Sequence, residues 1–179
     1  MKNGLIIAVL IACFSTTALA QIEKNSWMIG GSGNAGAYNT GFGNNLVYNL
    51  QLQATVGYFV ANNFALGISP GFLLIGSDNS SFYNVILPAF SRYYFNVSER
   101  ISLFPELNGG LGLASNANNT PFYLFNVAVG ASFWINKNVA FEPKFEYSIY
   151  DPNQVTPWVN KKIPQLKLGF QIYLNRGNE

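Results

Sequence analysis

Three charged side chains alternate along one short segment and have the residue types needed for acid–base chemistry. Glu142, Lys144 and Glu146 lie at every second position of NVAFEPKFEYSIY, residues 138–150. Alternate residues of an extended strand point to the same side, so the three side chains share one face. Two carboxylates on one face resemble the acid–base pair of a glycoside hydrolase. The lysine between them favours two ionised carboxylates, so we prefer the alternative that they form a scaffold of ion pairs.

Three further charged residues occupy the polar faces of other strand-like segments. Arg92 and Glu106 flank residues 96–100, a predicted tight turn that places the two side chains nearly opposite each other. Charges that leave water need paired partners, so we predict an ion-pair network inside the fold. The three positive and three negative charges of this predicted network cancel; its members are Arg92, Glu106, Glu142, Lys144, Glu146 and Lys167.

The amino-acid composition excludes several kinds of functional site. The sequence has no histidine and one cysteine, Cys13, which excludes the commonest general base and zinc sites built on His or Cys pairs. We predict no catalysis, no cofactor and no metal. Lipid-modifying enzymes that use histidine with serine are disfavoured for the same reason, whereas a serine–lysine arrangement stays open. The net charge is +2 without a basic cluster, so nucleic acid is not an expected partner.

The elements that must position these residues are segments of alternating apolar and polar residues. After residue 21 the chain shows no helical period but eight such segments, with turns rich in Asn, Gly, Ser and Pro between them. The segments span residues 26–33, 46–60, 64–75, 82–95, 101–113, 123–135, 138–150 and 165–174. Short connections at 61–63, 96–100 and 136–138 alternate with longer ones at 34–45, 76–81, 115–121 and 151–162. This alternation is typical of an all-β fold, an eight-stranded antiparallel up-and-down transmembrane β-barrel.

The composition of the two strand faces predicts which one lies inside. Charged residues make up only 10% of the chain, and the polar face is rich in Gly, Ala, Ser, Asn and Gln. A soluble exterior would carry roughly 25–35% charged residues, whereas a narrow barrel interior needs small side chains. Aromatic residues near both ends resemble interfacial girdles. We therefore expect outer-membrane lipid to contact the apolar face; a small non-specific pore and a soluble lipocalin-like exported barrel are the alternatives.

Four prolines conflict with regular strand pairing. They fall inside predicted strands, although proline cannot donate to a ladder and a closed barrel has no free edge. We expect bulges, local bends or different strand limits at Pro70, Pro88, Pro105 and Pro143.

The N-terminus has the features of an export signal. Lys2 precedes an apolar run at residues 5–14, and Ala-Leu-Ala at 18–20 provides a cleavage site with small residues. We predict a cleaved signal peptide at residues 1–20 and a barrel domain at 21–179. The sequence LIAC inside the apolar run resembles a lipoprotein-processing box, which is the alternative route of processing.

Three segments resemble a known family. VGYFVANNFALGI at residues 56–68, SRYYF at 91–95 and FWINKNVAFEPKFEY at 133–147 look like small outer-membrane β-barrel domain proteins of Bacteroidetes-type bacteria. That family is distantly similar to OmpA/OmpX-type eight-stranded barrels, and the resemblance covers nearly all of residues 21–179. It implies a location in the outer membrane of a Gram-negative bacterium, and it implies no reaction. Lys167-x-Gly169-x-x-Ile172-x-Leu174 in the last segment resembles the signal read by the outer-membrane assembly machinery, and we expect a monomer.

The longer connections are the remaining place for function. Exposed loops on a rigid barrel are natural binding elements. We single out Trp158, in the connection at residues 151–162, as a candidate contact for lipid, glycan or a partner. The predicted role is therefore structural or one of surface interaction, with an extracellular partner that the sequence does not specify.

Overall fold

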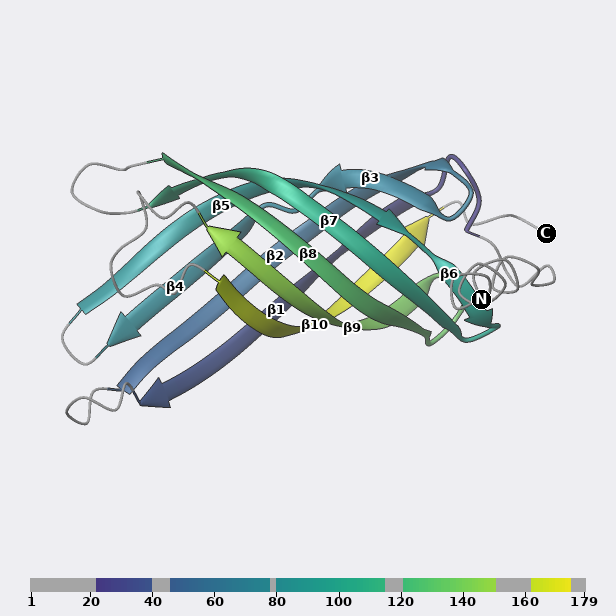
Figure 1. The fold of residues 1–179 in the computed structure, drawn as a ribbon. Coiled ribbons are helices and arrows are strands. Elements are labelled where there is room, and N and C mark those ends of the chain that lie inside the picture. The colour runs from purple at the N-terminus through teal and green to yellow at the C-terminus, as the bar shows by residue number, and fades with distance from the viewer. Residues whose placement is uncertain (1–21, 40–45, 78–79, 115–120, 151–161, 175–179) are drawn as a thin grey trace, which may run out of the picture.

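The computed structural model describes residues 22–39, 46–77, 80–114, 121–150 and 162–174, in which every regular element is a β-strand (Figure 1). The strands are β1 (Trp27–Asn39), β2 (Leu46–Ala61), β3 (Phe64–Ile68), β4 (Gly71–Ser77), β5 (Ser80–Tyr93), β6 (Phe95–Ser98), β7 (Ile101–Ala114), β8 (Pro121–Trp134), β9 (Val139–Tyr150) and β10 (Lys162–Leu174). Within these ranges, no helix is long and apolar enough to cross a membrane. The predicted signal peptide, Cys13 and Trp158 lie outside the described residues.

Antiparallel pairing of successive strands closes the sheet on itself. β1 pairs with β10, so the first and last strands complete the barrel seen in Figure 1. β3 and β4 continue each other, because both pair with β2 and both pair with β5. β5 and β6 are likewise consecutive partners of β7. The ten segments therefore form eight barrel strands, and the predicted eight-stranded antiparallel up-and-down barrel is confirmed.

The barrel has two distinct ends. We call the end with the β2–β3, β6–β7 and β8–β9 connections the turn end, and the opposite end the loop end. Pairing extends further than the apolar alternation: β1 continues to Asn39, so the loop predicted at residues 34–45 is shorter. Ser77 pairs with Ser80, so the connection at 76–81 is also shorter than predicted. Inter-strand hydrogen bonds join backbone groups, so strand pairing can extend beyond the segment in which apolar and polar side chains alternate.

The register that places Arg92 beside Glu106 agrees with the sequence prediction. Arg92 is paired with Glu106 across β5 and β7, and Gly130 is paired with Lys144 across β8 and β9. A Cβ atom at Gly130 would clash with the Phe104 ring and lie 2.9 Å from Lys144 Cβ. The missing side chain therefore makes room inside the barrel for the Phe104 ring and the lysine stem. The predicted turn at residues 96–100 is wrong in part, because β6 occupies residues 95–98.

Pro70 behaves differently from the other prolines. It lies in the break between β3 and β4, so the strand limits change there, as expected. Ser69 precedes it and donates its backbone N–H to the Pro88 carbonyl at 2.8 Å. The predicted bulges are wrong for Pro88, Pro105 and Pro143, because each pairs in continuous register with the next strand.

The ladder tolerates these prolines because pairing on one side is already interrupted. Pro105 lies between the part of β7 that pairs with β5 and the part that pairs with β6. Beside Pro143, the β8–β9 pairing omits two successive positions without a change of register. A proline without an N–H group fits where no ladder bond is made on that side.

Bulky apolar side chains cover the outside of the barrel, as the sequence predicts. Leu107, Val129 and Leu168 are 50%, 59% and 51% exposed, whereas Glu106 and Lys167 beside them in sequence are buried. Side chains alternate between the two faces of each strand, so this contrast follows from the strand geometry. The apolar face is the exterior.

The interior is less uniformly polar than the sequence analysis implies. An apolar group, here called the turn-end cluster, fills it near the short turns: Ile22, Met28, Phe59, Ala65, Phe90, Tyr94, Phe104, Trp134, Ala140 and Tyr173. Ile22 is anchored there because its N–H donates to Asn63 Oδ1 and its carbonyl accepts from the Asn63 N–H, both at 2.9 Å. Residues before β1 thus close this end together with the aromatic side chains.

Candidate functional site in the barrel interior

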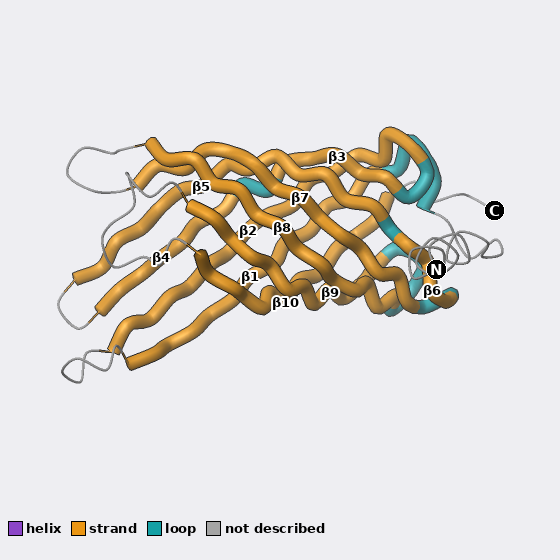
Figure 2. The backbone as a smooth tube through the Cα atoms, viewed as in Figure 1, coloured by secondary structure: helices purple, strands orange, loops and turns teal. Residues whose placement is uncertain are grey.

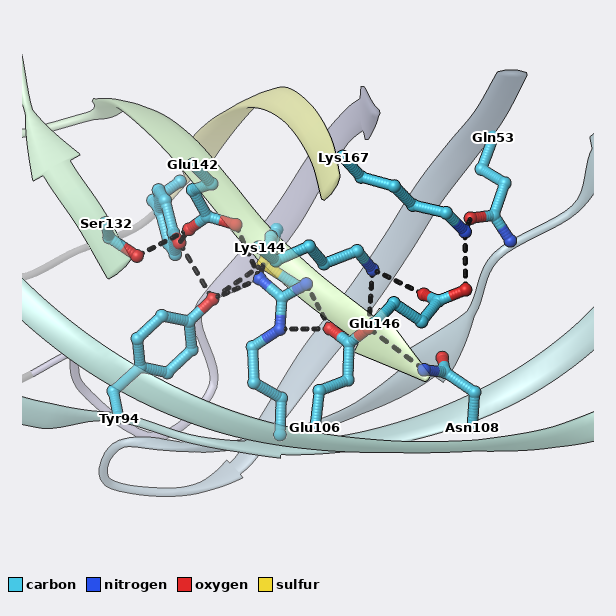
Figure 3. Close-up of polar contacts among 12 residues, drawn as sticks. Gln53, Tyr94, Glu106, Asn108, Ser132, Glu142, Lys144, Glu146 and Lys167 are labelled. Atoms are coloured by element: carbon cyan, nitrogen blue, oxygen red, sulfur yellow. Dashed lines mark hydrogen bonds and ion pairs between the residues drawn. The ribbon is translucent and has the colours of Figure 1, made fainter. Parts of the chain in front are cut away.

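Six charged side chains lie together in the barrel interior (Figure 3). All are inward-facing residues of regular strands, and none is more than 7% exposed. We call them the ion-pair network: Arg92 from β5, Glu106 from β7, Glu142, Lys144 and Glu146 from β9, and Lys167 from β10. The structure thus brings all six residues of the predicted set into one connected group.

Arg92 joins two carboxylates that come from different strands. Its Nε donates to Glu106 Oε2 at 2.5 Å, Nη2 pairs with the same oxygen, and Nη1 donates to Glu142 Oε2 at 2.7 Å. The guanidinium carbon also lies 4.2 Å from the centroid of the Phe104 ring, a cation–π contact. Arginine suits this position because its planar group presents five donors in fixed directions.

The two lysines extend the network toward the loop end. Lys144 Nζ lies 2.6 Å from Glu106 Oε1 and 3.5 Å from Glu146 Oε2, and Lys167 Nζ lies 2.6 Å from Glu146 Oε1. Negative and positive groups therefore alternate from Glu142 through Arg92 to Lys167. This order keeps each buried charge beside an opposite one, which offsets the cost of its desolvation.

One detail of the predicted pairing is wrong. The spacing on β9 indicates that Lys144 is shared by Glu142 and Glu146, but its second partner is Glu106. Glu142 instead pairs with Arg92, which reaches it from β5. The alternation along one strand defines a shared face, whereas the partners come from across the barrel.

Hydroxyl groups that the sequence analysis did not single out complete the turn-end side of the network. Glu142 Oε1 accepts from Ser132 Oγ and from Tyr173 OH, both at 2.6 Å. Tyr94 OH lies 2.8 Å from Tyr173 OH and accepts from Arg92 Nη1 at 2.8 Å. Strand alternation contains this signal, because Tyr94 follows Arg92 by two positions and so points to the same side.

Amide side chains continue the polar interior toward the loop end. Lys167 Nζ donates to Gln53 Oε1 at 2.6 Å, and Asn108 Nδ2 donates to Glu106 Oε1 at 3.0 Å (Figure 3). Further along, Gln51 is 1% exposed, yet neither its Nε2 nor its Oε1 has a hydrogen-bond partner among the described residues. A second buried apolar cluster, Ile86, Ala114, Phe122 and Leu124, also lies toward the loop end. The interior therefore changes along the barrel axis from aromatic through charged to a mixture of amide and apolar side chains.

The geometry favours a structural role for the carboxylates over an acid–base pair. Glu142 is engaged by Arg92, Ser132 and Tyr173, and Glu146 lies between two lysines. A general base needs access to the proton that it removes. Both oxygens of Glu142 and Oε1 of Glu146 accept from protein donors, whereas Glu146 Oε2 is buried 3.5 Å from Lys144 Nζ without a hydrogen-bond partner among the described residues. In the described part of the chain, no group of three or more His, Cys, Asp or Glu residues is placed to hold a metal ion.

Removal of one hydroxyl tests the turn-end side of the network. We expect Tyr173→Phe to lower the free energy of unfolding by about 1.5–3 kcal/mol, the usual worth of a hydrogen bond to a charged group. Tyr58→Phe is the control, because its hydroxyl donates to Asn25 Oδ1 at an exposed position. Urea titration of the detergent-folded protein measures both, and equal losses would contradict a special role for the buried hydroxyl.

Fold and interior together define an eight-stranded β-barrel with an apolar exterior and paired charges inside. No protein-family model matches the sequence, and no curated protein matches it. Solved structures with a similar fold include outer-membrane β-barrels.

Three solved structures illustrate this likeness. Neisserial surface protein A has a TM-score of 0.60 at 14% identity, covering 82% of this chain and 96% of that one. OprG of Pseudomonas aeruginosa has 0.56 at 12%, covering 87% and 99%. The N-terminal β-barrel domain of Pseudomonas aeruginosa OprF has 0.52 at 15%, covering 84% and 98%. The likeness establishes the fold; the predicted Bacteroidetes-type origin stays a prediction.

Proposed function

We propose that the protein is an integral outer-membrane β-barrel with a plugged interior, a structural or surface-interaction role and no catalysis. The observation that carries this proposal is the distribution of side chains, with bulky apolar groups outside and the ion-pair network inside. A soluble protein rarely exposes apolar patches beyond a few hundred Å². This argues against the soluble lipocalin-like alternative, in which the apolar face would fill the interior.

The remaining sequence predictions belong to the same proposal. We place the barrel domain at residues 21–179, exported by a signal peptide at residues 1–20 and inserted as a monomer by the outer-membrane assembly machinery of a Gram-negative bacterium. Trp158 stays the proposed loop contact for a surface partner. Lipid is the one partner that the exterior itself supports, because a belt of exposed leucine, valine and aromatic side chains suits a hydrocarbon environment.

Two layers of packed side chains support a plug over the alternative of a small pore. The turn-end cluster places six aromatic side chains inside the barrel: Phe59, Phe90, Tyr94, Phe104, Trp134 and Tyr173. Beside it, Arg92 extends from β5 to Glu142 on β9, so the ion-pair network crosses the interior. An ion would have to pass both layers. In the second layer, the charged groups are held close together in ion pairs.

Conductance in a planar bilayer tests this proposal. We expect the wild-type protein to insert without steady single-channel steps, because the aromatic and ionic layers leave no continuous path for hydrated ions. The informative variants are Arg92→Ala and Glu106→Ala, which remove opposite charges from one pair. Steady steps in the wild type that grow in either variant would contradict the plug and favour the pore.

A further inference from the structure

The pairing that closes the barrel covers only part of its seam. β1 and β10 pair over seven positions, which end at Gly33 and Leu168. Both strands extend further toward the loop end, where β1 still pairs with β2 and β10 still pairs with β9. Among the described residues, no pairing joins residues 34–39 to residues 162–167, and Figure 2 shows these two strand ends diverging. The barrel wall therefore has a lateral gap.

A gap of this kind leaves backbone polar groups on two strand edges without ladder partners among the described residues. In hydrocarbon, N–H and C=O groups that lack hydrogen bonds are costly. Addition of a foreign strand is one solution. Pro164 lies on the β10 edge, and proline cannot donate a ladder bond, which disfavours strand addition there. A ligand that brings its own polar group is the solution that fits the seam.

Amide side chains line the inner side of the gap. Asn34 Nδ2 donates to Gln165 Oε1 at 3.0 Å, a side-chain bridge from β1 to β10 where the backbone pairing has ended. Gln51 is paired with Asn34 in the β1–β2 register. Neither end of the buried Gln51 amide has a partner among the described residues, nor has Asn34 Oδ1. Buried amides are normally hydrogen-bonded, so these atoms indicate a ligand that both donates and accepts.

An apolar groove adjoins the gap on the outer surface. It is a shallow hollow, widely open to the surroundings, with a volume of about 720 Å³. Gly33 and Leu168, which end the seam pairing, line it, so the groove and the gap are continuous. The small residues Gly31 and Ala54 line the bottom of the groove. Its walls are formed by exposed apolar side chains: Leu52, Phe72, Leu168 and Phe170. The groove suits a hydrocarbon chain.

We propose that the seam binds a single-chain amphiphile with an uncharged, hydroxyl- or amide-bearing head group. The acyl chain lies in the outer groove, and the head group enters the gap to bond with Gln51 and Asn34. An uncharged head group fits because the lining groups are amides, and Lys167 on β10 is already bonded to Glu146 and Gln53. The inference rests on the proposed membrane location of the barrel.

Photo-crosslinking tests the site directly. The probe is 1-myristoylglycerol with a diazirine in its acyl chain, added to the full-length barrel reconstituted in phosphatidylcholine vesicles. After irradiation, mass spectrometry is expected to place the adducts on β1, β2, β4 and β10 around the groove. Unlabelled 1-myristoylglycerol should compete for the site, and myristic acid, whose head group is charged, should compete more weakly.

Two variants separate the parts of the site, each with a matched control. Ala54→Phe fills the groove, and Gln51→Leu removes the unpartnered amide. Each is expected to lower the adduct yield about fivefold, the change in binding expected when one typical contact is lost. Ala131→Phe, on the outward face of β8, and Asn126→Leu, which removes another interior amide whose Oδ1 has no partner among the described residues, should leave the yield unchanged. Yields are compared at equal folded fraction, measured by heat-modifiable gel mobility.

The possible failures are distinguishable. A barrel that does not insert into the vesicles contradicts the proposed membrane location. Adducts spread evenly around an inserted barrel, or yields that neither Ala54→Phe nor Gln51→Leu changes, would leave the location intact and overturn the site. Cross-linked dimers joined through β1 and β10 would assign the seam to a second copy of the chain and also overturn the proposal.

Discussion

Replacement of Arg92 by leucine is expected to lower the free energy of unfolding by about 3–5 kcal/mol, the typical cost of removing one partner of a buried ion pair. Arg92 is 2% exposed and joins Glu106 to Glu142. Its loss leaves Glu142 buried without a cationic partner, although Ser132 and Tyr173 still donate to it. Leucine has comparable apolar bulk near the Phe104 ring, so the expected cost is mainly electrostatic.

Urea titration of the barrel folded in phospholipid vesicles measures this change. Arg100→Leu is the matched control, because Arg100 is exposed beside the β6–β7 turn and its replacement should change stability by less than about 0.5 kcal/mol. A second variant distinguishes charge from packing. Arg92→Leu combined with Glu142→Leu should recover part of the loss, since replacement of a whole buried pair is often close to neutral.

Arg92→Lys adds a test of geometry at the same position. An ammonium group is a compact charge, so it cannot reproduce the separate guanidinium contacts with Glu106, Glu142 and Tyr94. We expect the free energy of unfolding of Arg92→Lys to lie between those of the wild type and Arg92→Leu. Equal stability of Arg92→Leu and Arg100→Leu would show that the ion-pair network does not support the fold.

The barrel was accessible to sequence analysis because local rules determine most of it. Strand alternation defines the two faces, and short turns fix the registers of the hairpins that they close. This is why the pairing of Arg92 with Glu106, and of Lys144 with Gly130, was predictable. Each of these pairs is separated by a single short connection.

The partners across the interior were not accessible in this way. Alternation shows that Lys144 and Glu142 point inward, but not that Glu142 meets Arg92 from a strand that is not its neighbour. That contact depends on the curvature of the closed barrel and on the length of the arginine side chain. The aromatic turn-end cluster was missed because its residues were judged by hydrophobicity, although Tyr94 and Tyr173 lie in register with the inward charges.

The seam between β1 and β10 escaped prediction for a related reason. No turn joins these strands, so no connection length fixes where their pairing stops. The Gly-rich part of β1 also has weak alternation, and strands of this kind specify their register poorly. The prolines show the same limit of sequence analysis. The sequence shows that each proline lacks a backbone N–H donor, whereas only the arrangement of the neighbouring strands shows that pairing is already interrupted beside it.

Replacement of Leu107 by arginine is expected to destabilise the barrel by about 2–4 kcal/mol in phospholipid vesicles, the range for a cationic residue at the bilayer midplane. Leu107 is 50% exposed and lies outward near the middle of β7, between the buried residues Glu106 and Asn108. Because its neighbours in sequence already point inward, the new guanidinium group can only face the apolar exterior.

Val97→Arg is the matched control for depth. Val97 is 59% exposed on β6 at the turn end, where an arginine near the membrane interface should cost only about 0–1 kcal/mol. The decisive quantity is the difference between the changes in unfolding free energy that the two substitutions cause, since the effect of placing arginine on an outward strand position is common to both.

In a soluble barrel both residues would face water, and exposed substitutions usually change stability by less than about 0.5 kcal/mol. Equal small costs would therefore contradict a membrane around the barrel, whereas a large cost confined to Leu107 would place the hydrocarbon layer around the middle of β7, at the level of the ion-pair network.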